Sequence, residues 1–287
     1  MLISHALLVP HLPTLLLDEH RGHRTEMLAA LAGASIRFLA DSPAIAVVLS
    51  ARWTAPGPFL VDVGKRHGTI TDYPGFGVEG RYDCLGAPAL ARALVLAGEK
   101  AGVHVGAATR GVDSGASIPM HFLAPARGVA VVPLSLPPRS AGECLKWGKV
   151  LRSVLASRSE RVGFVVGGVL SNDLHSWNLK RDVPEAREFD QRVLDALRRG
   201  AWDEVAAVER RLAEKAQPEA QLRHLEVLRG FLSGDARGEV RCYESGPGTG
   251  AALIEFPVTE GVEAPSTPGP AGPGPEGGAP PSPTEAT

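Results

Sequence analysis

The sequence has few cysteines and no excess of charge of either sign. Only three of its 287 residues are cysteines (Cys84, Cys144 and Cys242), and no two of them form a C-x-x-C pair. An odd number of widely spaced cysteines excludes a disulfide framework, and the missing C-x-x-C pair argues against a structural zinc site. Lys and Arg number 30 and Asp and Glu number 32, so we expect no nucleic-acid partner and no binding to an anionic membrane.

The apolar N-terminal segment lacks the features of a targeting sequence. No basic residue precedes its apolar run, which is interrupted within a short span by His5, Pro10, His11 and Pro13. We therefore expect neither a signal peptide nor a membrane span here. Together with cysteines that form no disulfide framework, this predicts a cytoplasmic protein.

The C-terminal part of the chain lacks residues that can pack. Residues 259–287 contain no Lys or Arg, and from Glu263 onwards they contain no aromatic or large aliphatic residue. Pro and Gly dominate instead, so the segment cannot bury enough apolar surface to offset the entropy lost on ordering. The sequence predicts an α/β domain over residues 1–258 and a disordered tail over residues 259–287.

Within the predicted domain, short apolar runs alternate with helical patterns. Apolar runs rich in β-branched residues and bounded by Pro or Gly predict buried strands at 44–49, 129–136 and 162–170. Helical patterns follow at 87–102, 140–156, 189–197 and 203–232, and a hairpin is predicted with its turn at 246–250. This alternation predicts a single α/β domain with a central mixed sheet flanked by helices.

Small, polar and titratable residues gather where predicted strands end, which is where α/β proteins build their sites. The segments are 9–13, 49–58, 110–119 and 167–175, and the acid Glu219 follows in the helix-rich stretch. Each also has a structural interpretation. His11 between two prolines could be a turn histidine, and Ser171-Asn172-Asp173 fits a helix N-cap. The glycine-rich turn at 246–250 lacks the Lys of a P-loop.

Taken in this order, the segments resemble the class III extradiol ring-cleavage dioxygenases, the family of the protocatechuate 4,5-dioxygenase β-subunit. The resemblance spans residues 2–256 and includes the stretches DYPGF (72–76), YDCLGAPALARAL (82–94), VVPLSLPP (131–138) and FDQRVLDALRRGAWDEV (189–205). It implies a mononuclear non-haem Fe(II) held by two histidines and one carboxylate. Such a centre leaves coordination positions open for a catechol-type substrate and O2.

Three of the five functional positions implied by this resemblance no longer carry a histidine. His11 matches the first metal ligand, and Glu219 matches the carboxylate ligand. Arg52 stands at the position of the second histidine ligand. Ser114 stands where a histidine supports substrate and oxygen, and Asn172 stands where a histidine acts as acid and base.

These replacements remove groups that iron-dependent ring cleavage needs. Arginine stays protonated and has no lone pair to donate, so Arg52 cannot ligate iron, and we expect Fe(II) binding to be weakened. Asn172 cannot exchange a proton near neutral pH, and a general acid or base is typically worth about 10²–10⁴-fold in rate.

Two compensating arrangements are conceivable from the sequence. His175, three residues after Asn172, could face the same cleft as a substitute ligand or acid/base group. Alternatively, the guanidinium of Arg52 would occupy the metal position and form an ion pair with Glu219. We interpret His121 as a core or helix-start histidine. Five further histidines carry no motif and are interpreted as surface or structural residues: His20, His23, His67, His104 and His224.

The sequence thus supports two interpretations. In the first, the chain keeps the fold and cleft of the family but its ring-cleavage activity is impaired or lost. It would then serve as a non-catalytic partner in a homo- or hetero-oligomer with a family paralogue, or bind an aromatic small molecule. In the second, it is an active dioxygenase that uses His11, Glu219 and an unusual third ligand such as His175.

Overall fold

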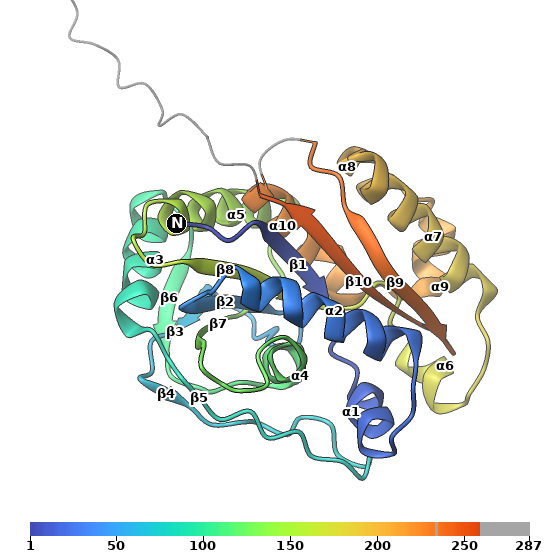
Figure 1. Cartoon of the computed structure of the whole chain (residues 1–287). Coiled ribbons are helices and arrows are strands. Elements are labelled where there is room, and N and C mark those ends of the chain that lie inside the picture. The colour runs from blue at the N-terminus through green and yellow to red at the C-terminus, as the bar shows by residue number, and fades with distance from the viewer. Residues whose placement is uncertain (233–234, 259–287) are drawn as a thin grey trace, which may run out of the picture.

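A mixed eight-stranded β-sheet runs through the centre of the molecule (Figure 1). The computed structural model describes residues 1–232 and 235–258, so the predicted tail at 259–287 lies outside the described residues. The strands of the sheet are β1 (His5–Val9), β2 (Ile45–Ser50), β3 (Phe59–Asp62), β6 (Val105–Ala108), β7 (Ala130–Leu134), β8 (Val162–Gly167), β9 (Glu239–Gly246) and β10 (Thr249–Pro257). A separate two-stranded sheet pairs β4 (Arg66–His67) with β5 (Cys84–Leu85).

The strand order is β6-β3-β7-β2-β8-β1-β10-β9. The central strands β7, β2, β8 and β1 are parallel, whereas β10 pairs antiparallel with both β1 and β9. The strands predicted at 44–49, 129–136 and 162–170 correspond to β2, β7 and β8, and the predicted hairpin is formed by β9 and β10. The prediction of a single α/β domain with a central mixed sheet is confirmed.

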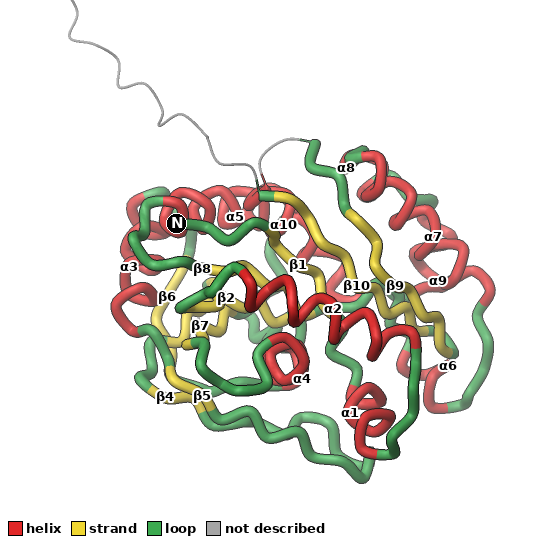
Figure 2. Tube along the Cα trace, viewed as in Figure 1, coloured by secondary structure: helices red, strands yellow, loops and turns green. Residues whose placement is uncertain are grey.

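Helices cover both faces of the sheet (Figure 2). Side chains of neighbouring strand residues point to opposite faces, so Val48 packs in one hydrophobic cluster and Val47 in the other. The Val48 cluster includes residues of α2 (Glu26–Ala40) and α4 (Ser114–Leu123). The Val47 cluster includes residues of the longer helices α3 (Pro88–Lys100), α5 (Ala141–Ala156), α7 (Pro184–Arg199) and α10 (Arg223–Leu232).

The sequence explains why these segments take their places. Every residue of β2 and β8 is buried, as their continuous apolar character predicts for strands covered on both faces. Ser140 caps the N-terminus of helix α5. Its hydroxyl accepts from the backbone N–H of Glu143, and the Glu143 carboxylate accepts from the Ser140 N–H. The shorter helices are α1 (Pro13–His20), α6 (Leu174–Asn178), α8 (Trp202–Ala206), α9 (Arg210–Ala216) and the 3-10 helix η1 (Glu219–Leu222). Within the described residues, every helix is too short or too polar to cross a lipid bilayer.

The parallel strands bring distant segments to one edge of the sheet. Their carboxyl ends lie together, so the residues that follow β1, β2 and β8 meet there. Helix α4 begins at the same place because Gly115 lacks a side chain. A Cβ on Gly115 would overlap the Oγ of Ser50, and a Cβ on Gly167 would overlap the carbonyl of Gly115. These two glycines let the first turn of α4 lie against the ends of β2 and β8.

Candidate functional site

A cavity of about 240 Å³ lies at this edge of the sheet. It is flanked by residues of α1, α6 and α4 and by the loop between β4 and β5. Four of the residues singled out in the sequence line it: His11, Arg52, Ser114 and Asn172. The fifth, Glu219, lies behind His11 and is buried. The fold therefore brings the five positions together, although they are spread over more than 200 residues of the chain.

His11 and Glu219 form a buried pair at the back of the cavity. The Nε2 atom of His11 lies 2.9 Å from both carboxylate oxygens of Glu219. The backbone N–H of Val169 donates to Oε2 of the same carboxylate at 2.8 Å. Burial alone would lower the pKa of His11, but the Glu219 carboxylate outweighs it and raises that pKa above its ordinary value. Burial would likewise raise the pKa of Glu219, but His11 outweighs it and lowers that pKa. Both directions favour an imidazolium–carboxylate ion pair.

A strained turn holds Glu219 in this position. The next three residues, Ala220, Gln221 and Leu222, all have φ between 47° and 57°. The left-handed region is unfavourable for residues other than glycine and persists only where the surroundings fix it. The guanidinium of Arg223 donates to the Ala220 carbonyl at 3.0 Å and to Oε1 of Gln221 at 2.7 Å. The turn is therefore tied in place by the residue that follows it.

His224 is a site-adjacent residue that the sequence analysis missed. It is completely buried, and neither ring nitrogen has a hydrogen-bond partner among the described residues. Burial lowers the pKa of His224 to about 4, against an opposing effect of Glu219, so the ring is neutral at neutral pH. The interpretation of His224 as a motif-free surface or structural residue overlooked one indication. Leu228 and Phe231 lie four and seven residues on, and this spacing places His224 on the buried face of α10.

Arg52 pairs with Asp72, and the expected ion pair between Arg52 and Glu219 does not form. The Nε atom of Arg52 lies 3.5 Å from Oδ2 of Asp72. The expectation was wrong because Glu219 is already occupied by His11 and by the backbone of Val169. The positive charge of Arg52 nevertheless acts on His11, because it opposes protonation of the ring and so lowers the pKa of His11.

Asp72, another residue that the sequence analysis did not assign to the site, contacts both Arg52 and Ser114, two positions where the resemblance predicts a histidine. Its Oδ1 accepts from the backbone N–H of Ser114, and its Oδ2 accepts from the Ser114 hydroxyl, both at 3.0 Å. Asp72 lies in the loop between β4 and β5, within the DYPGF stretch, so only the three-dimensional fold shows that it faces Arg52.

His175 lies outside the cavity. Its side chain is exposed, whereas Leu174 and Trp177 of the same short helix line the cavity. The helix is oriented by Asp173, whose carboxylate accepts from the backbone N–H groups of His175 and Ser176. The N-cap interpretation of this segment is therefore confirmed for Asp173. The geometry does not support the substitution of His175 for a lost ligand or acid/base group.

Aromatic side chains form one wall of the cavity. Tyr73 and Phe76 come from the loop between β4 and β5, and Trp177 comes from α6. The ring centroids of Phe76 and Trp177 are 5.2 Å apart, and those of Tyr73 and Phe76 are 6.4 Å apart. The cavity thus combines an aromatic wall with polar groups from Arg52 and Asn172, which suits a small ligand with an apolar ring and a polar substituent.

The residues present do not fit a mononuclear Fe(II) centre. Such a centre needs two histidines and a carboxylate that together leave coordination positions open. Here His11 and Glu219 bind each other. Arg52, at the position where the resemblance predicts the second histidine, carries a guanidinium without a lone pair. Across the described ranges, 1–232 and 235–258, no group of three or more His, Cys, Asp or Glu side chains is arranged to hold a metal ion. His224 therefore does not complete such a centre.

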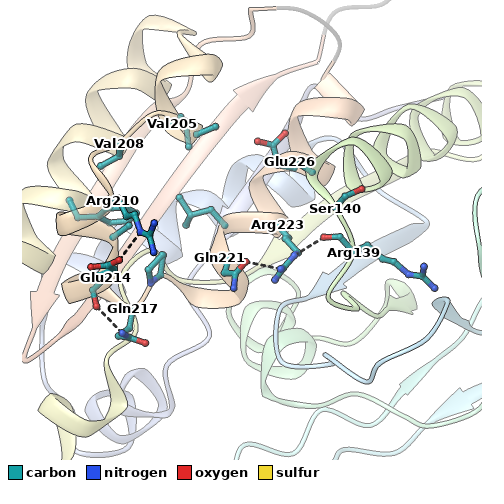
Figure 3. Close-up of a pocket in the computed structure, with 16 residues that line it drawn as sticks. Arg139, Ser140, Val205, Val208, Arg210, Glu214, Gln217, Gln221, Arg223 and Glu226 are labelled. Atoms are coloured by element: carbon teal, nitrogen blue, oxygen red, sulfur yellow. Dashed lines mark hydrogen bonds and ion pairs between the residues drawn. The ribbon is translucent and has the colours of Figure 1, made fainter.

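A larger cavity, of about 600 Å³, lies elsewhere (Figure 3). Gln221 and Leu222 of the turn after Glu219 line it, together with residues of α9 and the start of α5. Several of its charged groups already have partners, since Arg210 pairs with Glu214 at 2.7 Å and Arg223 donates to the Arg139 carbonyl at 2.7 Å. None of the residues singled out in the sequence lines this cavity. The smaller cavity is therefore the candidate site.

Comparison with known proteins assigns the chain to a family. A family model described as the catalytic LigB subunit of aromatic ring-opening dioxygenase matches residues 5–254. The chain belongs to the LigB family. The predicted resemblance is confirmed at this level, and the family supports a function of the ring-cleavage dioxygenase type. The closer likeness to the protocatechuate 4,5-dioxygenase β-subunit stays a prediction.

A solved structure shares the fold of this LigB-family chain. It is described as the uncharacterized protein JW3007 from Escherichia coli K12. The TM-score is 0.66 at 18% sequence identity, over 88% of this chain and 99% of that chain. At this identity the likeness shows the fold alone. No curated protein matches the chain.

Proposed function

We propose that this LigB-family protein binds a small aromatic molecule in the cavity between α1, α4 and α6, and that its iron-dependent ring cleavage is impaired or lost. One observation carries the proposal. Arg52, at the position of the second histidine ligand, lines the cavity, while the two remaining ligand residues bind each other.

The dimensions and lining of the cavity support a ligand with a single ring. Sites for drug-sized ligands usually enclose roughly 300–1,000 Å³, whereas this cavity encloses about 240 Å³. Phe76 and Trp177 offer ring faces and edges on one wall, and an aromatic pair typically adds about 0.5–1.5 kcal/mol beyond the area it buries. Asn172 and Thr249 provide hydrogen-bonding groups in the same cavity.

The lost chemistry follows from the same residues. In active members of such a family, the iron would supply open coordination positions for a catechol and O2. In this chain the Arg52 guanidinium cannot donate a lone pair, and His11 is engaged by Glu219. Asn172 can orient a ligand through its amide but cannot take up or release a proton near neutral pH. An active dioxygenase with His175 as a ligand is disfavoured because that side chain lies outside the cavity.

The role of a non-catalytic subunit in an oligomer with a family paralogue is compatible with this proposal, and so is a cytoplasmic location. Both stay predictions from the sequence.

Two measurements on the purified protein test the proposed function. Calorimetric titration in the presence of EDTA with catechols and other single-ring aromatics should detect binding, and an assay with Fe(II), O2 and the same catechols should yield no ring-fission product. Phe76→Ala should weaken binding because it removes part of the aromatic wall. Ile36→Ala, which removes an exposed side chain of α2, is the control and should leave binding unchanged. Sustained ring fission, or the absence of binding by every aromatic tested, would contradict the proposal.

A further inference from the structure

We infer that Arg52 takes over from the metal as the group that anchors the ligand, so that the cavity selects a single aromatic ring that carries a carboxylate. The inference rests on the proposed function and deepens it by naming the chemical class of the ligand. No metal and no pair of adjacent hydroxyl groups is required for this mode of binding.

The guanidinium of Arg52 is available to a ligand. Its side chain lines the cavity and is 34% exposed. Its ion pair with Asp72 is long, at 3.5 Å between Nε and Oδ2. Among the described residues, Arg52 forms one hydrogen bond, from its backbone N–H to the Ser50 hydroxyl at 3.2 Å, and the guanidinium forms none. The two terminal amino groups therefore retain N–H donors for an anion that enters the cavity.

Asp72 does not fully neutralise this cation, because its charge is shared with helix α4. Both of its carboxylate oxygens accept hydrogen bonds from Ser114, the first residue of that helix. Negative charge is favoured at a helix N-terminus, where unpaired backbone N–H groups lie. The replacement of histidine by serine at position 114 supplies the hydroxyl that forms one of these two bonds. The second carboxylate of the site, the buried Glu219, is bound to His11.

The backbone and the aliphatic stem of Arg52 are held before a ligand binds. Its Cγ lies 3.3 Å from where a Cβ on Gly115 would be, so its aliphatic stem packs against the first turn of α4. The Ser50 hydroxyl that accepts from the Arg52 backbone itself donates to Asp113 at 2.6 Å. The guanidinium at the end of this stem is a planar fork that matches a carboxylate through two parallel hydrogen bonds, and the packed stem reduces the entropy lost on binding.

The opposite wall defines the rest of the ligand. Tyr73, Phe76 and Trp177 line the same cavity as Arg52. A ligand that places a carboxylate on the guanidinium therefore places its remaining atoms against aromatic rings. Since the cavity encloses about 240 Å³, one aromatic ring with a directly attached carboxylate is the class of ligand that satisfies both walls.

Calorimetric titration of the EDTA-treated full-length protein with benzoate and benzamide tests the inference, because the two probes have nearly the same shape and differ in charge. We expect wild-type protein to bind benzoate about tenfold or more tightly than benzamide, since hydrogen bonds to a charged group are the stronger ones. Arg52→Gln should reduce this ratio to about one, and Arg52→Lys should retain part of it. Arg92→Gln, which removes an exposed arginine of α3, is the matched control and should leave the ratio unchanged.

The possible results separate this inference from the proposed function. If benzamide binds wild-type protein as tightly as benzoate, or if the ratio survives in Arg52→Gln, the inference is overturned while the aromatic-binding function stands. If neither these probes nor the catechols bind, both are overturned. If Arg52→Gln does not fold, Arg52→Lys is compared with wild type instead. An unchanged benzoate affinity and preference in Arg52→Lys would overturn the inference, because lysine cannot form the bidentate guanidinium contact.

Discussion

The residue at position 52 determines whether the cavity favours a metal ion or an anion. A histidine there would offer a lone pair, whereas arginine offers only N–H donors and a permanent positive charge. The structure places this charge in the same cavity as His11, which pairs with the buried Glu219. It also lies beside Asp72, whose carboxylate accepts from Ser114 of α4. These contacts support our proposal that Arg52 binds an anion that enters the cavity.

Asp190 is a second residue whose local chemistry affects the site. It is buried on α7 and accepts from the backbone N–H and the hydroxyl of Ser171, at 2.9 and 2.7 Å, and from the hydroxyl of Tyr243 at 2.9 Å. Burial raises the pKa of Asp190 from 3.8 to about 6, although these hydrogen bonds oppose the rise. Asp190 thus holds Ser171, the residue that precedes the cavity-lining Asn172.

Asp190→Asn should change the pH dependence of stability in a defined direction. Because the folded protein binds this proton more tightly than the unfolded chain, the Asp190 contribution makes stability fall as pH rises from about 4 to about 6, and the loss stays constant above that. Asparagine does not titrate, so the stability of the variant relative to wild type should rise over this interval by roughly 1–3 kcal/mol. Urea denaturation of both proteins from pH 4 to 8 measures this difference. Parallel curves would show that Asp190 does not titrate as described.

At the scale of elements, the site depends on the contact between α4 and the ends of β2 and β8. The strands themselves are evident in the sequence, because the apolar runs of β2 and β8 are continuous and bounded by Pro or Gly. Their polar termini also indicate where the site lies, since parallel strands end at one edge. The close approach of α4 could not be predicted, because it depends on which backbone atoms face Gly115 and Gly167 in the folded chain.

Gly115→Ala should destabilise the protein even though alanine is the better helix former. The added Cβ would overlap the Oγ of Ser50 and lie 3.1 Å from its Cβ. Overpacking of this kind costs roughly 1–3 kcal/mol, more than the ~1 kcal/mol at most that alanine gains over glycine in a helix. Gly142→Ala on α5 is the matched control, because nothing lies within 4 Å of the added Cβ there, and it should be neutral or slightly stabilising. Thermal denaturation compares the two, and equal melting temperatures would contradict the packing argument.

At the scale of the whole molecule, the fold of this LigB-family chain gathers residues that are distant in sequence around one cavity. The resemblance in sequence located four cavity-lining positions and the buried Glu219. It did not indicate the partners of these residues. Asp72 and His224 carry no motif that links them to the site, and the pairing of Arg52 with Asp72 instead of Glu219 is decided by which carboxylate His11 already binds. Pairings between residues distant in sequence depend on the complete packing and are therefore not readable from local patterns.

The iron content of the protein after anaerobic loading shows whether Arg52 prevents this chain from binding Fe(II). Wild-type protein and Arg52→His would be incubated with Fe(II) under anaerobic conditions, passed through a gel-filtration column and analysed for bound metal, with Arg92→His as the control. Because Arg52 supplies no lone pair, the account predicts clearly less than one iron per chain in wild type and in the control, and more in Arg52→His, which restores a second imidazole at this position. One tightly bound iron per chain in wild-type protein would contradict the account.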